Sequence, residues 1–208
     1  MSQPSAWGLS YQEIMGLCWL SYKGNPEGGG PKQGAWIIDG KQWNVDNVII
    51  EGSFAAIVAR GSRSVLALAG TDDAMDWVDN ISQGLLGVSN QYVKAVRYAK
   101  RYQPDVVVGH SLGGGMASYT SIYADMKAAT INAAPLNINP VSGIQILRRR
   151  RNVINYVVPG EVLHIMDRAM PTMTKIGTTH RVGSGGGGPV EKHLIKNLDG
   201  FVEPTRVG

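Results

Sequence analysis

The sequence is poor in cysteine, in charged residues and in long apolar runs. Cys18 is the only cysteine among 208 residues, so the chain forms no internal disulfide and nothing marks an oxidising compartment. Charged residues make up 17% of the chain, below the usual quarter, while the apolar share of 43% is ordinary and argues against disorder. No stretch reaches the roughly 18 apolar residues of a membrane-spanning helix. We therefore expect a folded protein without membrane spans.

The chain also lacks a basic segment followed by an apolar stretch at its N-terminus, so we expect no secretory signal peptide. On that basis the expected location is the cytoplasm, or outside the cell by a signal-independent route. A net charge of +4 and a pI near 9.2 are only mildly basic, and no nucleic-acid partner is expected. The length predicts one domain over residues 1–208.

Strand and helix patterns alternate along the chain. Periodicity and turn residues predict strands at 48–50, 54–60, 65–69, 105–108, 128–133 and 153–158, and helices at 91–102 and from 112 to about 125. In the first helix, the apolar stripe is expected at Val93, Val96 and Ala99. Alternation of this kind is typical of an α/β fold with a mostly parallel sheet flanked by helices.

One pentapeptide carries the chemistry. Gly109-His110-Ser111-Leu112-Gly113 is a G-x-S-x-G pattern between an apolar strand and a helix, the context that a nucleophile elbow requires. On such a sharp turn the Ser111 hydroxyl is presented to a histidine base. The Leu112 N–H, at the start of the helix, can help stabilise an oxyanion.

A second motif, VLALAGTDDAMDWVDNI at residues 65–81, precedes the elbow. Together with GHSLGGG it resembles the class 3 (fungal-type) lipase family of α/β-hydrolases, over residues 54–198. The resemblance implies an α/β-hydrolase fold and ester hydrolysis. It also implies that Thr71 is the second oxyanion donor.

The triad acid should follow the strand at 153–158, because the chain order in this fold is Ser, acid, His. Glu161 stands where the resembling family usually has aspartate. The extra methylene is tolerable because the acid only orients and stabilises the imidazolium. Asp167 stays an alternative.

Four histidines compete for the role of base. His110 lies inside the elbow and cannot turn back to Ser111, and His164 is only three residues from Glu161. His180 is expected to follow a strand at 174–176. His193 begins a predicted last helix at 192–198, where the resembling family places its base, and is preferred over His180. The oligoglycine at 183–188 raises the possibility that His193 is poorly ordered without substrate.

The chemistry predicts acyl transfer, and the resemblance favours a lipase or phospholipase. A non-lipid esterase or thioesterase of the same fold and a non-catalytic basic binding protein are the alternatives. Arg148 to Arg151 could contact an anionic membrane surface. Neither a cofactor nor a metal is expected, because Asp72, Asp73 and Asp76 do not complete a calcium loop. The sequence leaves open the acyl-chain length, the headgroup, the existence of a lid and the oligomeric state.

Overall fold

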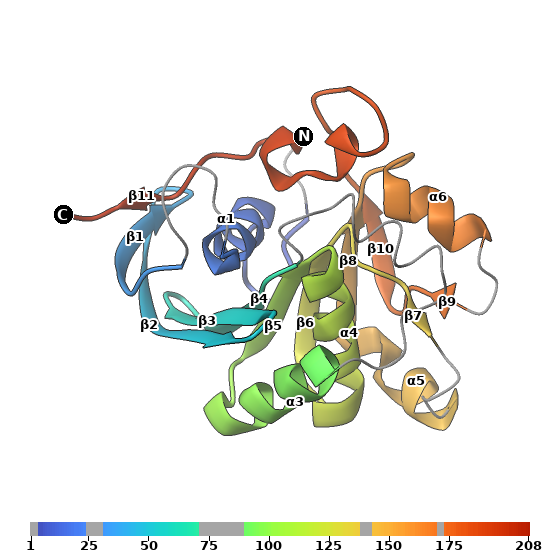
Figure 1. The fold of residues 1–208 in the computed structure, drawn as a ribbon, viewed down its shortest axis with the longest axis horizontal. Helices are drawn as coiled ribbons and strands as arrows, with labels where there is room; N and C mark the ends of the chain where they lie inside the picture. The colour runs from blue at the N-terminus through green and yellow to red at the C-terminus, as the bar shows by residue number, and fades with distance from the viewer. Residues whose placement is uncertain (1–3, 24–30, 71–89, 138–142, 170–172) are drawn as a thin grey trace.

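A computed structural model describes residues 4–23, 31–70, 90–137, 143–169 and 173–208 of the chain (Figure 1). Within these ranges the main sheet has nine strands in the order β10-β8-β6-β5-β4-β3-β2-β1-β11. Their bounds are β1 Gly34–Ile38, β2 Lys41–Glu51, β3 Phe54–Arg60, β4 Ser64–Leu68, β5 Val106–His110, β6 Lys127–Ile131, β8 Val153–Val157, β10 Thr178–Arg181 and β11 Thr205–Arg206. A separate antiparallel pair joins β7 (Leu136–Asn137) to β9 (Met173–Thr174).

The sheet has a parallel half and an antiparallel half that meet at β4. The strands β4, β5, β6, β8 and β10 pair in parallel, whereas β1, β2, β3, β4 and β11 pair antiparallel. The α/β class is thus confirmed, with a mixed sheet. The carboxyl ends of the parallel strands meet at one edge, where such sheets place their ligand sites.

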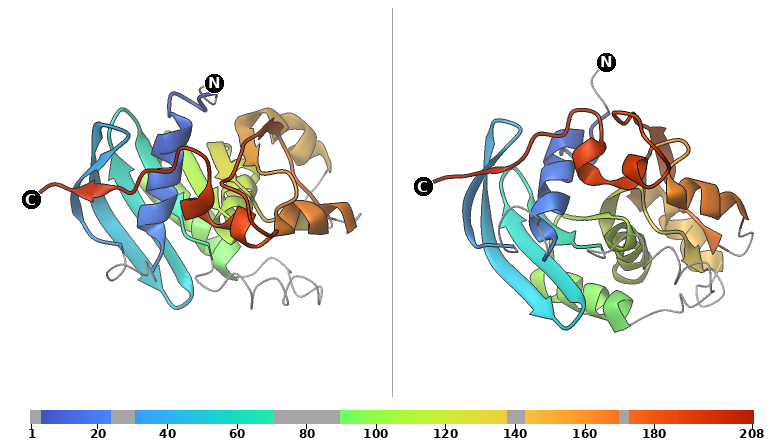
Figure 2. Two further views of the ribbon diagram at one scale, coloured as in Figure 1. Left: turned by 90° about the horizontal axis from the view of Figure 1, so that it is seen from above. Right: turned by 45° about the horizontal axis from the view of Figure 1, so that its top comes forward.

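Helices cover both faces of the sheet. The helices are α1 Tyr11–Ser21, α3 Asn90–Tyr102, α4 Leu112–Ala124, α5 Gly143–Arg149 and α6 Val162–Ala169, with 3₁₀ turns η1 Arg150–Asn152, η2 Glu191–His193 and η3 Ile195–Asn197. Figure 2 shows α1 and the C-terminal segment together on one face, with α3 and α4 on the other.

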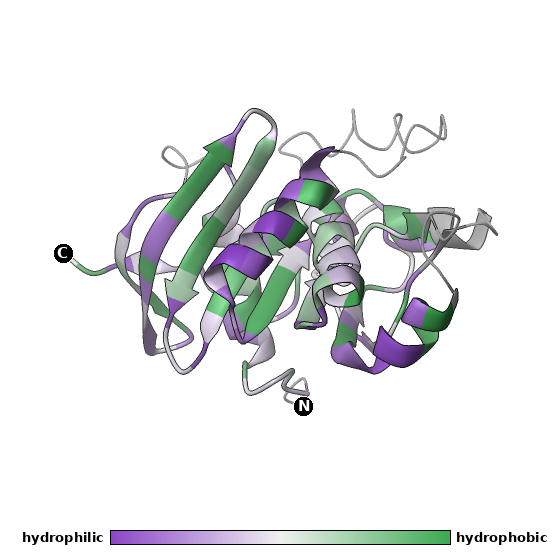
Figure 3. Ribbon diagram, turned by 90° about the horizontal axis from the view of Figure 1, so that it is seen from below, coloured by the Kyte–Doolittle hydropathy of each residue, from purple (hydrophilic) through white to green (hydrophobic). Residues whose placement is uncertain are grey.

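Alternating residues of the central strands form two cores. On β4, Leu66 and Leu68 pack with α3 and α4, while Val65 and Ala67 pack with α1 and with Ile195 of the C-terminal segment. All four strand residues are fully buried, as expected for a strand covered on both faces. In Figure 3 the central strands are correspondingly hydrophobic, whereas α3 carries hydrophilic turns on its outer side.

Helix α1 begins with a capping box. The Ser10 hydroxyl accepts from the Glu13 N–H, and the Glu13 carboxylate accepts from the Ser10 N–H at 2.8 Å. Glu13 is fully buried and pairs with Lys41 at 3.0 Å, so its charge is compensated where it leaves water. This box fixes the start of a helix that ends beside the carboxyl ends of the parallel strands, where Tyr22 contacts His110 of β5.

Most predicted elements are confirmed, and three details are wrong. On α3 the buried face is Tyr92, Ala95, Tyr98 and Ala99. Ala99 is therefore confirmed and Val96 packs against the core, whereas Val93 is 55% exposed because the tyrosine rings take the buried side of the helix. The last helix is instead the two 3₁₀ turns η2 and η3, whose buried Ile195 and Leu198 follow the three-residue period of such turns. The strand expected at 174–176 is replaced by β9 and β10.

Among the helices that the described ranges contain, none combines the length and the apolar character needed to cross a membrane.

Leu66→Ala should lower the free energy of unfolding by about 2–5 kcal/mol, because it leaves a cavity between β4 and the helices α3 and α4. Ile50→Ala is the matched control: Ile50 is 56% exposed, and its loss should change stability by less than about 0.5 kcal/mol. Urea denaturation of both variants measures the difference. Equal stabilities would contradict the assignment of Leu66 to the core.

Candidate active site

Ser111 lies on a strained turn between β5 and α4. Its φ of 59° and ψ of −127° are unusual for a residue with a side chain, at a cost on the order of 1–3 kcal/mol. The backbone around it is held firmly: Ser111 N–H donates to Ile131 O at 3.1 Å. Its carbonyl accepts from Gly115 at 3.1 Å and from Ala134 at 2.9 Å. The turn therefore has the geometry of a nucleophile elbow.

Two glycines allow the backbone to close around this turn. A Cβ on Gly109 would overlap the Gly113 carbonyl, and a Cβ on Gly113 would overlap the Leu68 carbonyl of β4. Leu112 is the first residue of α4, so its N–H has no acceptor within the helix and lies at the positive end of the helix dipole. An oxyanion beside Ser111 would find a donor there.

Glu161 lies just after β8, where the acid is expected. Gly160 turns the chain with a φ of 79°, and the Glu161 side chain becomes fully buried at the start of α6. Its Oε2 accepts from the Leu163 N–H at 2.9 Å, while Oε1 lies 3.8 Å from Lys175 Nζ. These partners compensate the negative charge of the buried carboxylate.

His193 is the histidine that reaches this carboxylate. Its Nδ1 lies 2.8 Å from Glu161 Oε2, and the residue is only 1% exposed. An ionised carboxylate can only accept, so Nδ1 carries the proton and Nε2 of the neutral ring keeps its lone pair. Within the described residues, Nε2 is buried without a hydrogen-bond partner. The ring is thus oriented to take a proton at Nε2.

The segment that carries His193 is ordered by hydrogen bonds. Gly185 N–H donates to Asn197 O at 2.8 Å, and Asp199 N–H donates to Gly183 O at 3.1 Å, so the oligoglycine closes onto η3. The Lys192 N–H also donates to Gly188 O at 3.0 Å. The expectation that these glycines leave His193 poorly placed is therefore wrong for this structure.

In the described part of the chain, none of the other three histidines bonds to Glu161. His180 is on β10 with its ring against Tyr156, 5.8 Å between centroids, and His164 is on α6. Both ring nitrogens of His110 are engaged, one by Tyr22 and one by the His193 carbonyl. Among the described histidines, only His193 forms an ion pair with a carboxylate.

Some predicted residues lie outside what the structure describes. Thr71, the aspartates at 72, 73 and 76, and Trp77 belong to the undescribed range 71–89. Asp167 is on α6, but its side chain is outside the described part. The roles of Thr71 and Asp167 accordingly stay predictions. In the described ranges no three His, Cys, Asp or Glu side chains converge as a metal site.

Sequence reasoning missed three residues around the site. Asn132, at the end of β6, accepts from the Val158 N–H at 2.9 Å and approaches the His193 carbonyl at 3.4 Å, so it links the acid's strand to the base's turn. Its position directly after a buried strand was the available signal. Tyr22 and Lys175 carried no such signal, because both come from segments without a motif.

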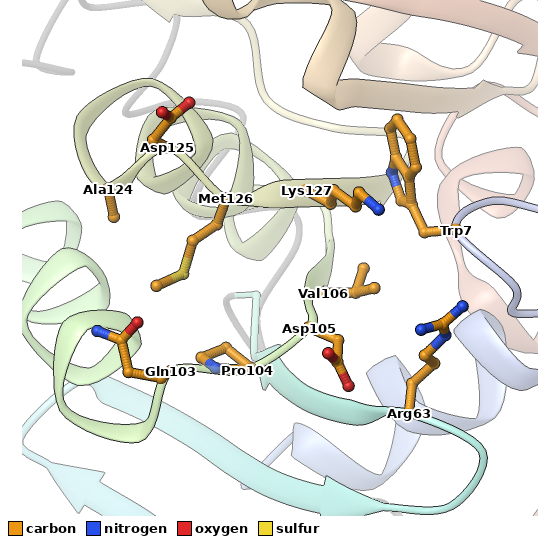
Figure 4. A pocket seen from close by; sticks show the side chains of 10 residues that line it. All are labelled: Trp7, Arg63, Gln103, Pro104, Asp105, Val106, Ala124, Asp125, Met126 and Lys127. Carbon is orange, nitrogen blue, oxygen red and sulfur yellow. The ribbon is translucent and has the colours of Figure 1, made fainter.

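A cavity of about 300 Å³ lies at the opposite edge of the sheet (Figure 4). Its lining comes from the amino ends of β5 and β6, from the end of α4 and from the turn after α3. Trp7, Arg63 and Lys127 also line it. Helix α4 has 13 residues and is therefore about 20 Å long, which separates this cavity from Ser111. The cavity is not part of the catalytic edge.

Gly109→Ala should destabilise the protein by about 1–3 kcal/mol or more, because the new Cβ meets backbone that cannot move aside. Gly143→Ala is the matched control: a Cβ there contacts nothing, and alanine favours the helix that Gly143 begins. Thermal unfolding of the two variants compares them. A Gly109→Ala protein as stable as wild type would argue against the close packing of the elbow.

Comparisons with known proteins identify the family of the chain. A family model for the Tle-like phospholipase domain matches residues 52–201. An extracellular phospholipase A1 from Serratia liquefaciens is 42% identical over 88 residues, which cover 40% of this chain and 28% of that protein. The aligned part is thus well under two thirds of that relative.

Two solved structures are also similar, at lower identity. The Rhizomucor miehei lipase propeptide complex has 14% identity and a TM-score of 0.46, over 67% of this chain and 57% of that one. MDLA from Penicillium cyclopium has 13% identity and a TM-score of 0.49, over 76% and 69%. Likeness at this level has no bearing on function. Because the family model matches more than half of the chain, the chain belongs to the Tle-like phospholipase domain family.

Proposed function

We propose that the chain is a serine hydrolase that cleaves carboxylic esters of phospholipids. Ser111 is the nucleophile, His193 the general base and Glu161 the acid of its triad. The observation that supports this most is the His193 ring: Nδ1 is bonded to a buried carboxylate, and Nε2 is buried with no hydrogen-bond partner among the described residues. A buried lone pair without a donor costs free energy, and a catalytic role explains why the protein keeps one here.

The reaction follows from these positions. His193 Nε2 takes the proton of the Ser111 hydroxyl as Oγ attacks the ester carbonyl carbon, and the carbonyl oxygen becomes an oxyanion beside the Leu112 N–H. Thr71 supplies the second donor in this proposal. The imidazolium, stabilised by Glu161, then gives its proton to the departing alcohol. Water, deprotonated by His193, cleaves the acyl-enzyme and releases the fatty acid.

The choice of substrate rests on the family and on the named relative. The family is phospholipase-like, and the Serratia protein is called a phospholipase A1, so a lipid ester is the substrate class to test first. On α6, directly after Glu161, Leu163 is buried and Ile165 is 49% exposed, which offers apolar surface near the catalytic edge.

Peripheral contact with an anionic membrane is part of this proposal, but the arginine run does not lie at the site. Arg149 donates to the Ile122 carbonyl and pairs with Asp125 at 3.3 Å, at the far end of α4 from Ser111. The length of α4 puts Arg148 to Arg151 about 20 Å from the nucleophile. A membrane contact through these arginines would therefore lie away from Ser111.

Ser111→Ala should lower kcat by at least about 10⁴-fold on phospholipid vesicles and on p-nitrophenyl esters, with the fold unchanged, because no other group forms the acyl-enzyme. Fatty-acid release and nitrophenol absorbance measure it. Activity on short-chain esters alone would redirect the proposal to a non-lipid esterase. A wild-type protein inactive on every ester and thioester tested would contradict the proposal.

His193→Ala should abolish turnover, whereas His180→Ala should retain most of it. Glu161→Gln should lower kcat by about 10⁴-fold, because a neutral amide no longer stabilises the imidazolium, and Asp167→Asn should have little effect. The four variants are compared at equal enzyme concentration after circular dichroism has verified their folds. The opposite pattern within either pair would transfer the role to His180 or to Asp167.

A further inference from the structure

His110, the residue before the nucleophile, lies between Tyr22 and the backbone of His193. Its Nδ1 is 2.6 Å from the Tyr22 hydroxyl oxygen, and its Nε2 is 2.7 Å from the His193 carbonyl oxygen. The side chain is buried, with 4% of the residue exposed. The catalytic steps described above use neither of these nitrogens, so the two hydrogen bonds call for another explanation.

The partners determine the tautomer of His110. A carbonyl oxygen only accepts, so the proton must be on Nε2, which donates to His193 O. A neutral imidazole has one N–H, and Nδ1 therefore accepts from the Tyr22 hydroxyl. Burial lowers the pKa of His110 well below its ordinary value, and the neighbouring His193 lowers it further. The ring thus stays neutral with its proton on Nε2.

This arrangement attaches the base directly to the strand of the nucleophile. The His193 side chain is held by Glu161, and its carbonyl is held by His110, the chain neighbour of Ser111. Asn132 approaches the same carbonyl at 3.4 Å, but its geometry is weaker than the 2.7 Å bond from His110. Among the described residues, the bond from His110 is therefore the main contact of the His193 carbonyl.

Tyr22 connects this bond to the rest of the catalytic edge. It follows α1 after the C-terminal turn of that helix, and a Cβ on Gly70, the residue before Thr71, would overlap its hydroxyl. The ring of Tyr22 also lies 6.0 Å from that of His110. One phenol thus contacts both the elbow and the end of the segment that leads into the predicted oxyanion loop.

We infer that His110 is a positioning residue for the general base: as a neutral Nε2–H donor, supported by the Tyr22 hydroxyl, it holds the carbonyl of His193 and thereby sets the place of His193 Nε2 relative to Ser111. The inference rests on the proposed function. A displacement of about 1 Å in a catalytic group can cost about 100-fold in rate, so this bond has a measurable effect on turnover.

The test compares two variants of equal shape that differ in the donor. His110→Gln keeps an N–H near the place of Nε2, whereas His110→Met removes it. His110→Met should lower kcat on a p-nitrophenyl ester about 10- to 100-fold with KM within about twofold, and His110→Gln should recover at least about tenfold of that loss. Gln42→Met, on an exposed position of β2 in the antiparallel half of the sheet, is the control and should leave kcat unchanged. Equal rates for wild type and His110→Met, or equal loss in both folded variants, would overturn the inference.

A second readout uses the wild-type protein alone. Long-range ¹H–¹⁵N spectra should show His110 protonated at Nε2 and unprotonated at Nδ1, without change from pH 8 to pH 5.5. A proton on Nδ1, or titration near the ordinary pKa of histidine, would overturn it even if neither variant folds. Labelling of Ser111 by a fluorophosphonate separates the two proposals: absent labelling and absent hydrolysis in wild type would contradict the proposed function, while the tautomer is still measured.

Discussion

The hydrogen bond between Glu161 Oε2 and His193 Nδ1 is the constraint on which the catalytic edge depends. It joins the end of β8 to the C-terminal segment, 32 positions further along the chain, and both side chains are almost fully buried. A carboxylate removed from water must find compensating partners, and Glu161 has the Leu163 N–H, Lys175 and the imidazole. These partners come from three segments: α6, the segment of Lys175 and the C-terminal turns. The buried carboxylate is therefore compensated only when all three are folded.

The elbow illustrates how the fold retains a strained residue. Ser111 has a positive φ, yet its N–H donates to Ile131 at the end of β6, and its carbonyl accepts from Gly115 of α4 and from Ala134. Gly109 and Gly113 permit this closure because a Cβ at either place would overlap backbone. The packed junction between sheet and helix thus offsets the strain. Its hydrogen bonds hold the backbone that carries the Ser111 hydroxyl.

Local signals predicted the part of the site that lies within one strand–turn–helix unit. The elbow could be predicted because β5, Ser111 and α4 are consecutive, and Glu161 because it directly follows a buried strand. The contacts of Asn132, Tyr22 and Lys175 could not, since they join segments that no periodicity relates. The form of the C-terminal segment was also beyond prediction: Ile195 and Leu198 suggest a helix by spacing, but packing against the α1 face leaves only two short turns.

Two imidazoles close together beside Ser111 would repel each other if both were charged, and the burial of His110 prevents this. The ring centroids of His110 and His193 are 4.8 Å apart, and in the proposed mechanism His193 becomes an imidazolium. A charged His110 would oppose that step, since like charges at this distance repel strongly in a buried site. Burial, together with the neighbouring His193, holds the pKa of His110 well below its ordinary value, so His110 adds no positive charge beside His193. In the proposed mechanism, His110 therefore holds the His193 carbonyl without competing for the proton that His193 takes from Ser111.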